Sequence, residues 1–481
     1  MHRSLKFAAV TGTFLIASAA TLALAGNWGQ FRGPNASGRA EREDRLPDEV
    51  GPETNVVWKV ELPGGHSSPV IFGDRIYLTG KNDDGLRTYC LDRETGKVRW
   101  QAPALHKVLE EIHKTASYAT PTPATDGKVV VSFFGSCGLF GYDLDGRQLW
   151  HIPMGPFKND FGSGTSPILV EDRVILCQDH DTDSFIMAVD KFTGKVLWKV
   201  DRSEFPRNYC TPIIWEVAGK KQVVVAATLR IVGYDFETGK EIWTVRGVAR
   251  IINMTPVIGD DGTLYAACWS PGGDETDRII TEPFDYVIKQ QDANKDGSIN
   301  LEEAPAGPIK DRFTQVDRDK DGQITRQEYE SMRNVFEAAR NVMVAVKPGG
   351  TGDITDTHVL WRYNKQMPYC PSPVYYRDQI FMIKNGGILA VVDARNGQPL
   401  KQGRISATGD YFASPVAGDG KIYTLSYQGK LTVIDAGPGW REISSADFGE
   451  NAAASPAIAD GRLYVRTAGH LYCFGLPGTS P

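Results

Sequence analysis

Two twelve-residue segments in the middle of the chain carry oxygen-bearing side chains at regular intervals. The first is DANKDGSINLEE, Asp292 to Glu303, and the second is DRDKDGQITRQE, Asp317 to Glu328. Each has a glycine at its sixth position, where a tight bend is needed. A hard cation such as Ca²⁺ takes about six to eight oxygen ligands, which alternate side chains of a bent loop can supply. The pattern therefore predicts two cation sites.

Both segments resemble the EF-hand calcium loop at each of its ligand positions. The resemblance implies two Ca²⁺ ions, with the following ligands: Asp292, Asn294, Asp296, Ser298, Asn300 and Glu303 for one ion, and Asp317, Asp319, Asp321, Gln323, Thr325 and Glu328 for the other. In such loops the seventh residue binds through its carbonyl, the ninth acts through water, and the final Glu binds with both carboxylate oxygens.

The sequence around the loops favours a compact insertion. Helix-forming residues precede the first loop at 283–291 and follow the second at 326–342. Ile299 and Ile324 occupy the eighth position of each loop and can pair through a short β contact. The linker 304–316 contains two prolines and a glycine, so we expect one short helix there. Calcium is then expected to stabilise the folded insertion rather than to expose a groove that binds a target protein.

A β-forming unit repeats through the rest of the chain. Each copy opens with Ser or Thr followed by Pro, and the eight prolines are Pro69, Pro123, Pro167, Pro212, Pro256, Pro373, Pro415 and Pro456. Most neighbours are about 41–54 residues apart, a period typical of a β-propeller with one four-stranded blade per repeat. The gap from Pro256 to Pro373 is far longer, which places both loops inside the fifth blade.

A second signature ends each of the first four repeats. It is an Asp-containing turn with Gly, followed by a strand that ends in tryptophan, at Trp100, Trp150, Trp198 and Trp243. Glycine supplies the positive φ of the turn, and the large indole can pack between blades. The last repeat has no such strand, whereas residues 55–62 form one with no repeat before it. We expect this strand to complete the eighth blade and close the ring.

The spacing Asp-x-x-Thr-Gly-x-x-x-Trp resembles the repeat of PQQ-type β-propellers, the family of quinoprotein dehydrogenases and BamB-type outer-membrane assembly lipoproteins. The resemblance covers about residues 27–270 and 341–475. It implies an all-β, eight-bladed propeller with a small α-helical EF-hand insertion in blade five. The expected segments are an extended region at 26–54, blades at 55–270 and 341–475, the insertion at 271–340 and a tail at 476–481.

The same resemblance leaves three functions open. Quinoprotein dehydrogenases resemble one another in adjacent cysteines, a Trp floor, and Glu, Asn and Asp around a calcium beside the quinone. This chain has no adjacent cysteines, so no catalytic residue is assigned. A non-enzymatic binding or scaffold protein is favoured. The alternatives are a PQQ-dependent alcohol or sugar dehydrogenase and a BamB-like assembly factor.

The first residues indicate export. Basic Arg3 and Lys6, an apolar run and Ala23-Leu24-Ala25 predict a signal peptide over 1–25, hence a periplasmic or secreted protein without a membrane span after cleavage. The formal net charge of −6 argues against nucleic acid as the partner. The seven cysteines are scattered singly, and most are expected to be buried and free.

Aromatic or imidazole residues stand shortly before several repeat prolines. They are His66, Tyr118, Tyr209, Tyr369 and Tyr411. If the prolines open the innermost strands, these side chains could ring one mouth of the central funnel and bind a small polar or sugar-like ligand by stacking. The alternative is that each packs on a neighbouring blade and hydrogen-bonds its backbone. An unidentified protein is the other expected partner. The stretch ALHKVLEEIHKTAS, 104–117, is predicted to be helical.

Overall fold

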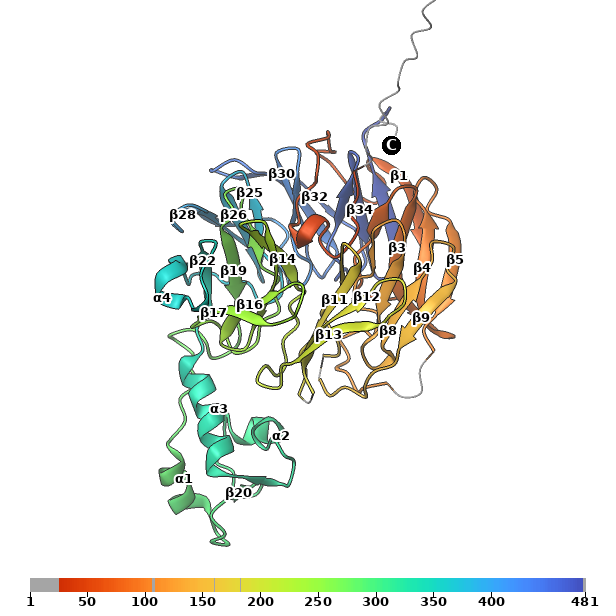
Figure 1. Ribbon diagram of the computed structural model, residues 1–481. Coiled ribbons are helices and arrows are strands. Elements are labelled where there is room, and N and C mark those ends of the chain that lie inside the picture. The colour runs from red at the N-terminus through yellow and green to blue at the C-terminus, as the bar shows by residue number, and fades with distance from the viewer. Residues whose placement is uncertain (1–25, 106–108, 160, 182, 479–481) are drawn as a thin grey trace, which may run out of the picture.

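Eight antiparallel sheets are arranged around a central axis in the computed structural model (Figure 1). The structure describes residues 26–105, 109–159, 161–181 and 183–478, so the predicted signal peptide lies outside the described residues. The predicted eight-bladed, all-β propeller is confirmed. Each repeat proline immediately precedes the innermost strand of a blade, as at Pro69 before Val70.

The first four blades, from inner to outer strand, are β2 (Val70–Phe72), β3 (Arg75–Asn82), β4 (Gly85–Asp92), β5 (Val98–Pro103); β6 (Ala124–Thr125), β7 (Val130–Phe133), β8 (Leu139–Tyr142), β9 (Gln148–Ile152); β10 (Ile168–Val170), β11 (Arg173–Gln178), β12 (Phe185–Asp190), β13 (Val196–Asp201); and β14 (Ile213–Val217), β15 (Lys220–Ala227), β16 (Arg230–Asp235), β17 (Glu241–Arg246).

The other four are β18 (Val257–Ile258), β19 (Leu264–Cys268), β22 (Val342–Val346), β24 (Val359–Tyr363); β25 (Val374–Tyr376), β26 (Gln379–Lys384), β27 (Ile388–Asp393), β28 (Pro399–Arg404); β29 (Val416–Gly418), β30 (Lys421–Leu425), β31 (Lys430–Asp435), β32 (Arg441–Asp447); and β33 (Ala457–Ala459), β34 (Arg462–Arg466), β35 (His470–Phe474), β1 (Val56–Glu61).

The N-terminal strand closes the ring. β1 runs antiparallel to β35, with Trp58 opposite Cys473 and Glu61 opposite His470. The outermost strand of the last blade therefore comes from the beginning of the chain. Because β1 belongs to the sheet of the last blade and leads along the chain into the first blade, the ring opens only if the β1–β35 ladder breaks.

Tryptophan and glycine dock one blade on the next. The indole N–H of Trp198 donates to the carbonyl of Phe236 at 3.0 Å, and a Cβ on Gly239 would lie 2.6 Å from the Trp198 ring. The same indole-to-carbonyl bond recurs at four other junctions: Trp58 to Arg93, Trp100 to Leu144, Trp150 to Lys191 and Trp361 to Ala394. The turn glycine thus provides both a positive φ and room for the indole.

Blades four and five meet differently. The long turn of blade five contributes β23 (Gly352–Asp353), which pairs in parallel with β17 and places Gly352 opposite Trp243. The indole of Trp243 accordingly donates within its own blade, to Gln222 at 2.6 Å, and packs edge-on against Trp215. The extra strand replaces the short Asp-Thr-Gly turn used elsewhere.

The predicted helix at 104–117 is wrong, because residues 109–117 form loop and turns. Glu110 is buried, and its carboxylate accepts a hydrogen bond from the Ser136 backbone at 3.2 Å. Its carbonyl accepts another from the Tyr118 hydroxyl. These contacts with blade two outweigh the helix propensity of the segment. All seven cysteines are free, and all but Cys370 are buried, as expected.

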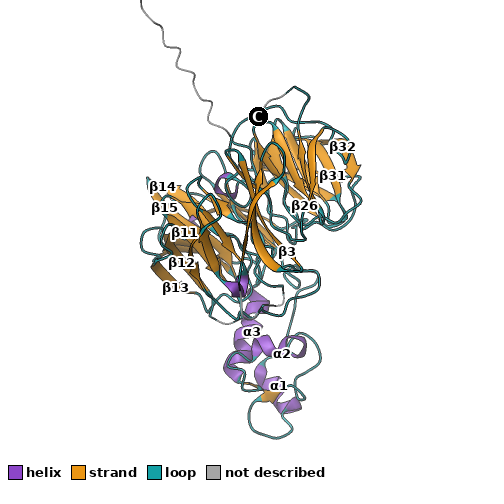
Figure 2. Ribbon diagram, turned by 90° about the vertical axis from the view of Figure 1, so that its right-hand side faces the viewer, coloured by secondary structure: helices purple, strands orange, loops and turns teal. Residues whose placement is uncertain are grey.

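A small α-helical unit leaves the fifth blade after β19 and returns at β22. It contains α1 (Phe284–Gln291), β20 (Ile299–Asn300), η3 (Lys310–Arg312), α2 (Phe313–Val316), β21 (Gln323–Ile324) and α3 (Arg326–Ala338). It projects from the end of the propeller opposite the C-terminus (Figures 1 and 2). Its own apolar core includes Phe284, Phe313, Tyr329 and Phe336.

Three short helical turns complete the described structure: η1 (Pro34–Ala36), η2 (Gly135–Cys137) and α4 (Thr355–His358). In the part of the chain that the structure describes, no helix combines the length and the apolarity needed to cross a membrane.

Candidate metal loops and the central cavity

The second loop gathers three carboxylates. Oxygen atoms of Asp317, Asp319 and Asp321 lie within 4.8 Å of one another. Asp317 is only 5% exposed, and one of its carboxylate oxygens, Oδ2, accepts from the Gly322 backbone at 3.0 Å. The other, Oδ1, is buried without a hydrogen-bond partner among the described residues. A buried, unpartnered carboxylate oxygen is costly unless a cation completes its environment.

Glu328 is held at the mouth of the same loop. Its Oε1 accepts from the Arg318 backbone at 2.8 Å, and its Oε2 accepts from the Thr325 backbone at 2.9 Å and hydroxyl at 2.7 Å. Burial raises the pKa of this carboxyl, but the hydrogen bonds outweigh it and leave the pKa below its usual value. Thr325 also caps α3. Glu328 is therefore an anchored carboxylate.

The first loop repeats this arrangement. Oε1 of Glu303 accepts from the Ala293 backbone at 3.0 Å, and its Oε2 accepts from the Asn300 backbone at 3.1 Å. Asp292 accepts from Gly297 at 3.0 Å, as Asp317 does from Gly322. Both loops thus bend at a glycine toward the carboxylate of their first residue, and both fix the final Glu through backbone N–H groups.

The two loops form one unit. Ile299 pairs with Ile324 in the short β20–β21 ladder, and both side chains are fully buried. Across the ladder, the Ser298 hydroxyl lies 2.8 Å from the side-chain amide of Gln323. The two loops are therefore in direct contact.

The remaining predicted ligands have other partners in this structure. The Asn300 side chain accepts from the Glu303 backbone at 3.1 Å, while Thr325 caps α3. Hydrogen bonds from Ser298, and to a smaller extent the one that the Asn294 amide donates at 2.7 Å, lower the pKa of Asp296. Each predicted ligand residue can offer an oxygen atom, and Ca²⁺ prefers oxygen ligands. The residues present therefore fit Ca²⁺. The ligand assignment stays a prediction.

A central cavity of about 230 Å³ lies on the propeller axis. Three of the five predicted ligand-binding residues line it: His66, Tyr209 and Tyr369. Tyr118 and Tyr411 instead donate their hydroxyls to backbone carbonyls, of Glu110 at 2.7 Å and of Ala407 at 2.6 Å. Tyr118 and Tyr411 therefore follow the alternative expectation, in which the aromatic residue hydrogen-bonds the backbone instead of lining the cavity.

A chain of hydrogen bonds surrounds this cavity, and it was missed by the sequence reasoning. From blade one to blade seven, the Ser or Thr before the repeat proline donates its backbone N–H to the hydroxyl of its counterpart in the next blade. The bonds run from Ser68 to Thr122 (3.0 Å), Thr122 to Ser166 (3.0 Å), Ser166 to Thr211 (3.0 Å), Thr211 to Thr255 (3.2 Å), Thr255 to Ser372 (3.0 Å), Ser372 to Ser414 (2.9 Å) and Ser414 to Ser455 (2.9 Å). The Ser/Thr-Pro dipeptide at the start of all eight repeats is the sequence feature from which this chain of hydrogen bonds could have been predicted.

At the junction of the eighth and first blades an arginine makes the connection. Arg466, fully buried, donates to the Ser67 hydroxyl at 2.7 Å, the Thr79 carbonyl at 2.9 Å and the Pro63 carbonyl at 3.0 Å. Burial, with the positive charge of Arg466 nearby, lowers the pKa of His66 to about 4. His66 is therefore neutral at physiological pH.

The cavity does not fit the cofactor of quinoprotein dehydrogenases. Among the described residues that line it there is no Lys, Arg, Asp, Glu or Trp, and Cys370 has no adjacent cysteine. PQQ is a tricarboxylate, and burying its charges without paired groups is unfavourable. Nor is there a carboxylate here to hold a calcium beside a quinone. The only amide that lines the cavity within the described chain is that of Asn253.

The family model described as outer membrane protein assembly factor BamB matches residues 48–181, 119–268 and 307–476. These spans include strands of every blade and more than half of the chain. The chain belongs to this family of PQQ-like propellers. No curated protein matches the sequence.

Solved propellers share the fold at low sequence identity. BamB from Moraxella catarrhalis is 15% identical, with a TM-score of 0.56 over 89% of this chain and 98% of that one. Quinohemoprotein alcohol dehydrogenase from Comamonas testosteroni is 12% identical, with a TM-score of 0.55 over 95% and 82%. The computationally designed Ika8 protein is also 12% identical, with a TM-score of 0.54 over 88% and 100%. At such identity the likeness concerns the fold alone.

Proposed function

We propose that this member of the family is an exported calcium-binding protein that acts as a binding or scaffold protein, not as an enzyme. The observation that carries the proposal is the buried, unpartnered Oδ1 of Asp317 beside the carboxylates of Asp319 and Asp321. Export is supported by the composition of residues 1–25, which lie outside the described part of the chain.

The chemistry of both loops supports two bound ions. Each loop presents a carboxylate at its first position and an anchored Glu at its last, and glycines with φ of +84° and +85° let the backbone turn between them. Calcium would add oxygen coordination to groups that the fold already holds close together. Because the ion binds the folded loops, its binding free energy stabilises the insertion.

Calorimetric titration of the metal-stripped full chain with CaCl₂ tests the proposal. We expect two ions per chain. Glu303→Gln and Glu328→Gln should each remove one ion, or weaken it at least about tenfold, because each loses a bidentate ligand. Glu302→Gln, which neutralises the exposed neighbouring residue, should keep both ions. Absence of calcium binding in the unmodified protein would overturn the proposal.

The central cavity is the proposed site for a small, neutral, polar or sugar-like ligand. Ser68, Thr122, Ser166, Ser372, Ser414 and Ser455 line it, and each hydroxyl that accepts a backbone N–H keeps its own proton to donate. Tyr209 and Tyr369 supply aromatic rings beside them. A ligand of this kind should raise the melting temperature, because it binds the folded state only.

A thermal-shift screen with neutral sugars and PQQ separates binding from redox chemistry. We expect stabilisation by a neutral sugar and none by PQQ with calcium. Tyr369→Ala should abolish the shift, while Tyr286→Ala, an exposed residue of α1, should preserve it. Stoichiometric PQQ binding with dye-linked oxidation of alcohols or sugars would replace the binding proposal with the dehydrogenase alternative.

A further inference from the structure

A second cavity lies where the insertion meets the propeller. It has a volume of about 230 Å³ and is lined on one side by residues 181, 204, 206–207, 228 and 250–251, and on the other by residues 314–318, 320, 328, 331–332 and 335. We call it the junction cleft. The second calcium loop contributes Asp317 and Glu328 to its wall. The cleft and the central cavity share loops, since Arg207 and Ile251 line one while Tyr209 and Asn253 line the other.

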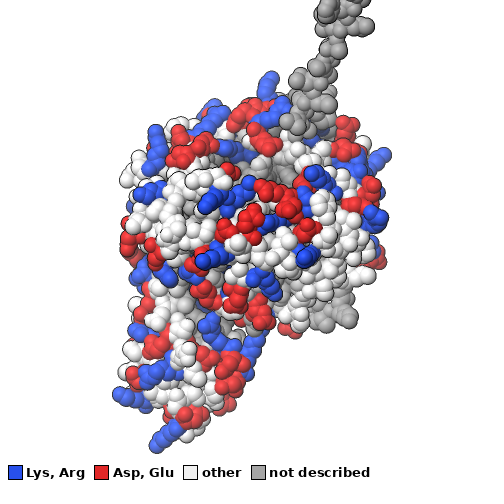
Figure 3. Space-filling view, in the orientation of Figure 1, with Lys and Arg blue, Asp and Glu red and all other residues white. Residues whose placement is uncertain are grey.

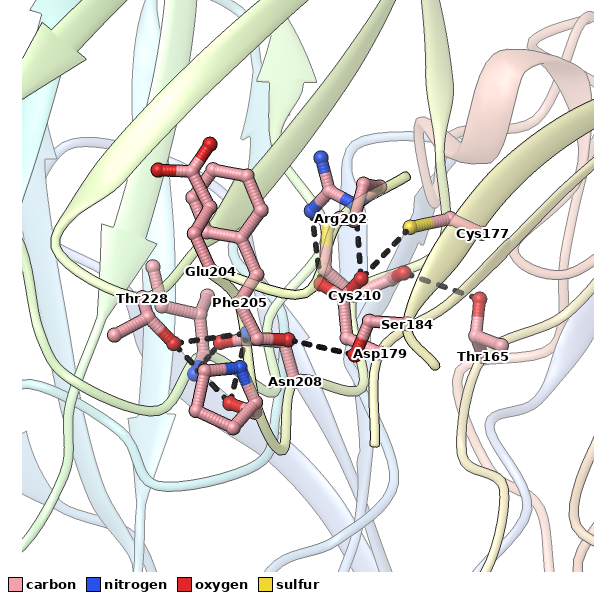
Figure 4. A network of polar contacts seen from close by, with 12 residues as sticks. Thr165, Cys177, Asp179, Ser184, Arg202, Glu204, Phe205, Asn208, Cys210 and Thr228 are labelled. Atoms are coloured by element: carbon pink, nitrogen blue, oxygen red, sulfur yellow. Dashed lines mark hydrogen bonds and ion pairs between the residues drawn. The ribbon is translucent and has the colours of Figure 1, made fainter. Parts of the chain in front are cut away.

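The propeller side of the junction cleft is held rigidly (Figure 4). Arg202 and Asp179 are both buried and form a bidentate pair with two N–H···O contacts of 2.8 Å. The Ser184 hydroxyl donates to the Phe205 carbonyl at 3.2 Å, and the adjacent Asn208 donates to Thr228 at 3.1 Å. The cleft wall at 204–207 is thus hydrogen-bonded to neighbouring loops of the propeller.

Arg250 is the distinctive side chain of the junction cleft. It is 9% exposed, packs on the Phe336 ring at 5.8 Å, and donates from Nε to the Pro271 carbonyl at 3.4 Å. Among the described residues, no carboxylate lies within ion-pair distance of its guanidinium. A buried arginine without a carboxylate keeps its charge at a cost that an anion can remove.

The acidic residues on the propeller side of the cleft are already neutralised. Asp181 pairs with Arg207 at 2.5 Å, and Glu204 pairs with Arg230 at 2.5 Å. Neither carboxylate competes with an incoming anion for Arg250. The terminal nitrogens of Arg250 are thus the natural partners for a carboxylate, whose two oxygens match the guanidinium fork.

The charge of the cleft depends on the second calcium loop. Charged lining residues are four acidic ones, Asp181, Glu204, Asp317 and Glu328, and four basic ones, Arg207, Arg250, Arg318 and Lys320, so their formal charges cancel. A calcium ion on Asp317 and Glu328 adds two positive charges at this wall. On the face of the insertion that Figure 3 shows, acidic and basic side chains are interspersed.

We propose that the junction cleft binds the carboxylate of a small organic acid, with Arg250 as the bidentate partner, and that calcium in the second loop strengthens this binding. The coupling rests on the proposed calcium site. Pro206, Ile251, Met332 and Val335 also line the cleft, so an apolar body attached to the carboxylate can be buried. The enclosed volume suits a molecule of roughly ten non-hydrogen atoms rather than a polymer.

Calorimetry with benzoate as the probe tests the proposal on the full chain. We expect benzoate to bind metal-stripped protein weakly and calcium-loaded protein at least about tenfold more tightly. By linkage, saturating benzoate should then tighten calcium binding to the second loop by the same factor. Benzamide, which has the same shape without the charge, should not bind in either state.

Four variants locate the effect. Arg250→Gln should abolish benzoate binding while two calcium ions still bind, and Arg250→Lys, which keeps the charge but loses the fork, should weaken it about tenfold. Arg246→Gln, an exposed residue of β17, should change nothing. Asp321→Ala removes a ligand that is not part of the cleft wall, so benzoate binding should lose its calcium dependence. Should Arg250→Gln fail to fold, Arg250→Lys with retained calcium stoichiometry carries the test.

The outcomes separate the two proposals. Two bound calcium ions without any benzoate binding would overturn the cleft proposal and leave the calcium proposal intact. Benzoate binding that survives Arg250→Gln, or that is equal with and without calcium, would overturn the assigned residue or the coupling respectively. A protein that binds no calcium would overturn the calcium proposal and the coupling together. Sulfate binding as tight as benzoate would overturn the assignment to a carboxylate with an apolar body.

Discussion

Arg318, the second residue of the second loop, donates a hydrogen bond from its guanidinium to the backbone carbonyl of Ser203 at 3.2 Å. The backbone N–H of the same arginine donates to Glu328 at 2.8 Å. One residue therefore contacts both the anchored carboxylate of the loop and the propeller. Near the root of the insertion, Arg340 donates its backbone N–H to the carbonyl of Val248 at 3.1 Å. The orientation of the insertion on the propeller therefore depends in part on Arg318, a residue of the second loop.

Removing calcium should loosen the insertion without opening the propeller. The carboxylates of Asp317, Asp319 and Asp321 repel one another when no cation lies between them, and the ion's binding free energy is lost from the folded insertion. Hydrogen–deuterium exchange should rise in peptides from 284–338 on metal stripping, while β15 and β16 remain protected. Equal exchange with and without calcium would contradict a stabilising role of the ion.

Gly239→Ala should destabilise the propeller by more than a positive φ alone explains. Gly239 has φ +74° and a new Cβ would lie 2.6 Å from Trp198, whereas Gly219 has the same φ and open space. We expect about 1–2 kcal/mol of lost stability for Gly219→Ala and about 1–3 kcal/mol more for Gly239→Ala, from urea denaturation. Equal losses would show that the indole moves away freely.

Thr211→Val should expose the role of the hydroxyl chain around the axis. The Thr211 hydroxyl accepts the backbone N–H of Ser166 at 3.0 Å, and both residues are buried. Valine has nearly the same shape but leaves that N–H without an acceptor, at a cost of about 1–3 kcal/mol. Thr211→Ser keeps the acceptor and should lose clearly less stability. If valine and serine are equally tolerated in thermal melts, the bond contributes nothing to blade packing.

Stability should fall as pH drops from about 6.5 to about 4. Burial lowers the pKa of His180 to about 4, and burial with the Arg466 charge does the same for His66. In this window the unfolded chain binds protons that the folded protein does not, so the free energy of unfolding rises with pH. The stabilising contribution of each neutral histidine is complete above the pKa that it has in the unfolded chain. It is lost as pH falls toward its lower pKa in the folded protein.

The measurement is the slope of unfolding free energy against pH. His180→Asn should make that slope shallower between pH 4 and 6.5, whatever its effect on absolute stability. An unaltered slope in the His180 variant would mean that this imidazole is protonated in the folded protein.

Much of the fold was predictable because each blade is encoded by a recurring sequence unit that can be counted. Eight Ser/Thr-Pro openings predicted eight blades, and the missing outer strand of the last repeat predicted the pairing of β1 with β35. The two loops were predicted from local spacing, since a chelating loop places its ligands within a dozen residues. Their short β contact at Ile299 and Ile324 followed from the same pattern.

The cavity residues were predicted less well. Tyr118 and Tyr411 stand shortly before a repeat proline, as Tyr369 does, yet their hydroxyls reach backbone carbonyls instead of the axis. The stretch 109–117 had a helical pattern, but buried Glu110 ties it to blade two. In both cases the deciding partner lies in a contact that local sequence does not encode.

The sequence by itself determined the number of blades, the strand that closes the ring and the positions of the acidic loops, because each depends on periodic or short-range spacing. Only the tertiary structure decided that repeat hydroxyls form a chain around the axis and that the described residues lining the axial cavity carry no charged side chain. It also decided that Arg250 and the second loop line one cleft, with no described carboxylate in ion-pair distance of Arg250. Those features arise where segments far apart in the chain come together, so burial and charge there depend on how the blades and the insertion pack.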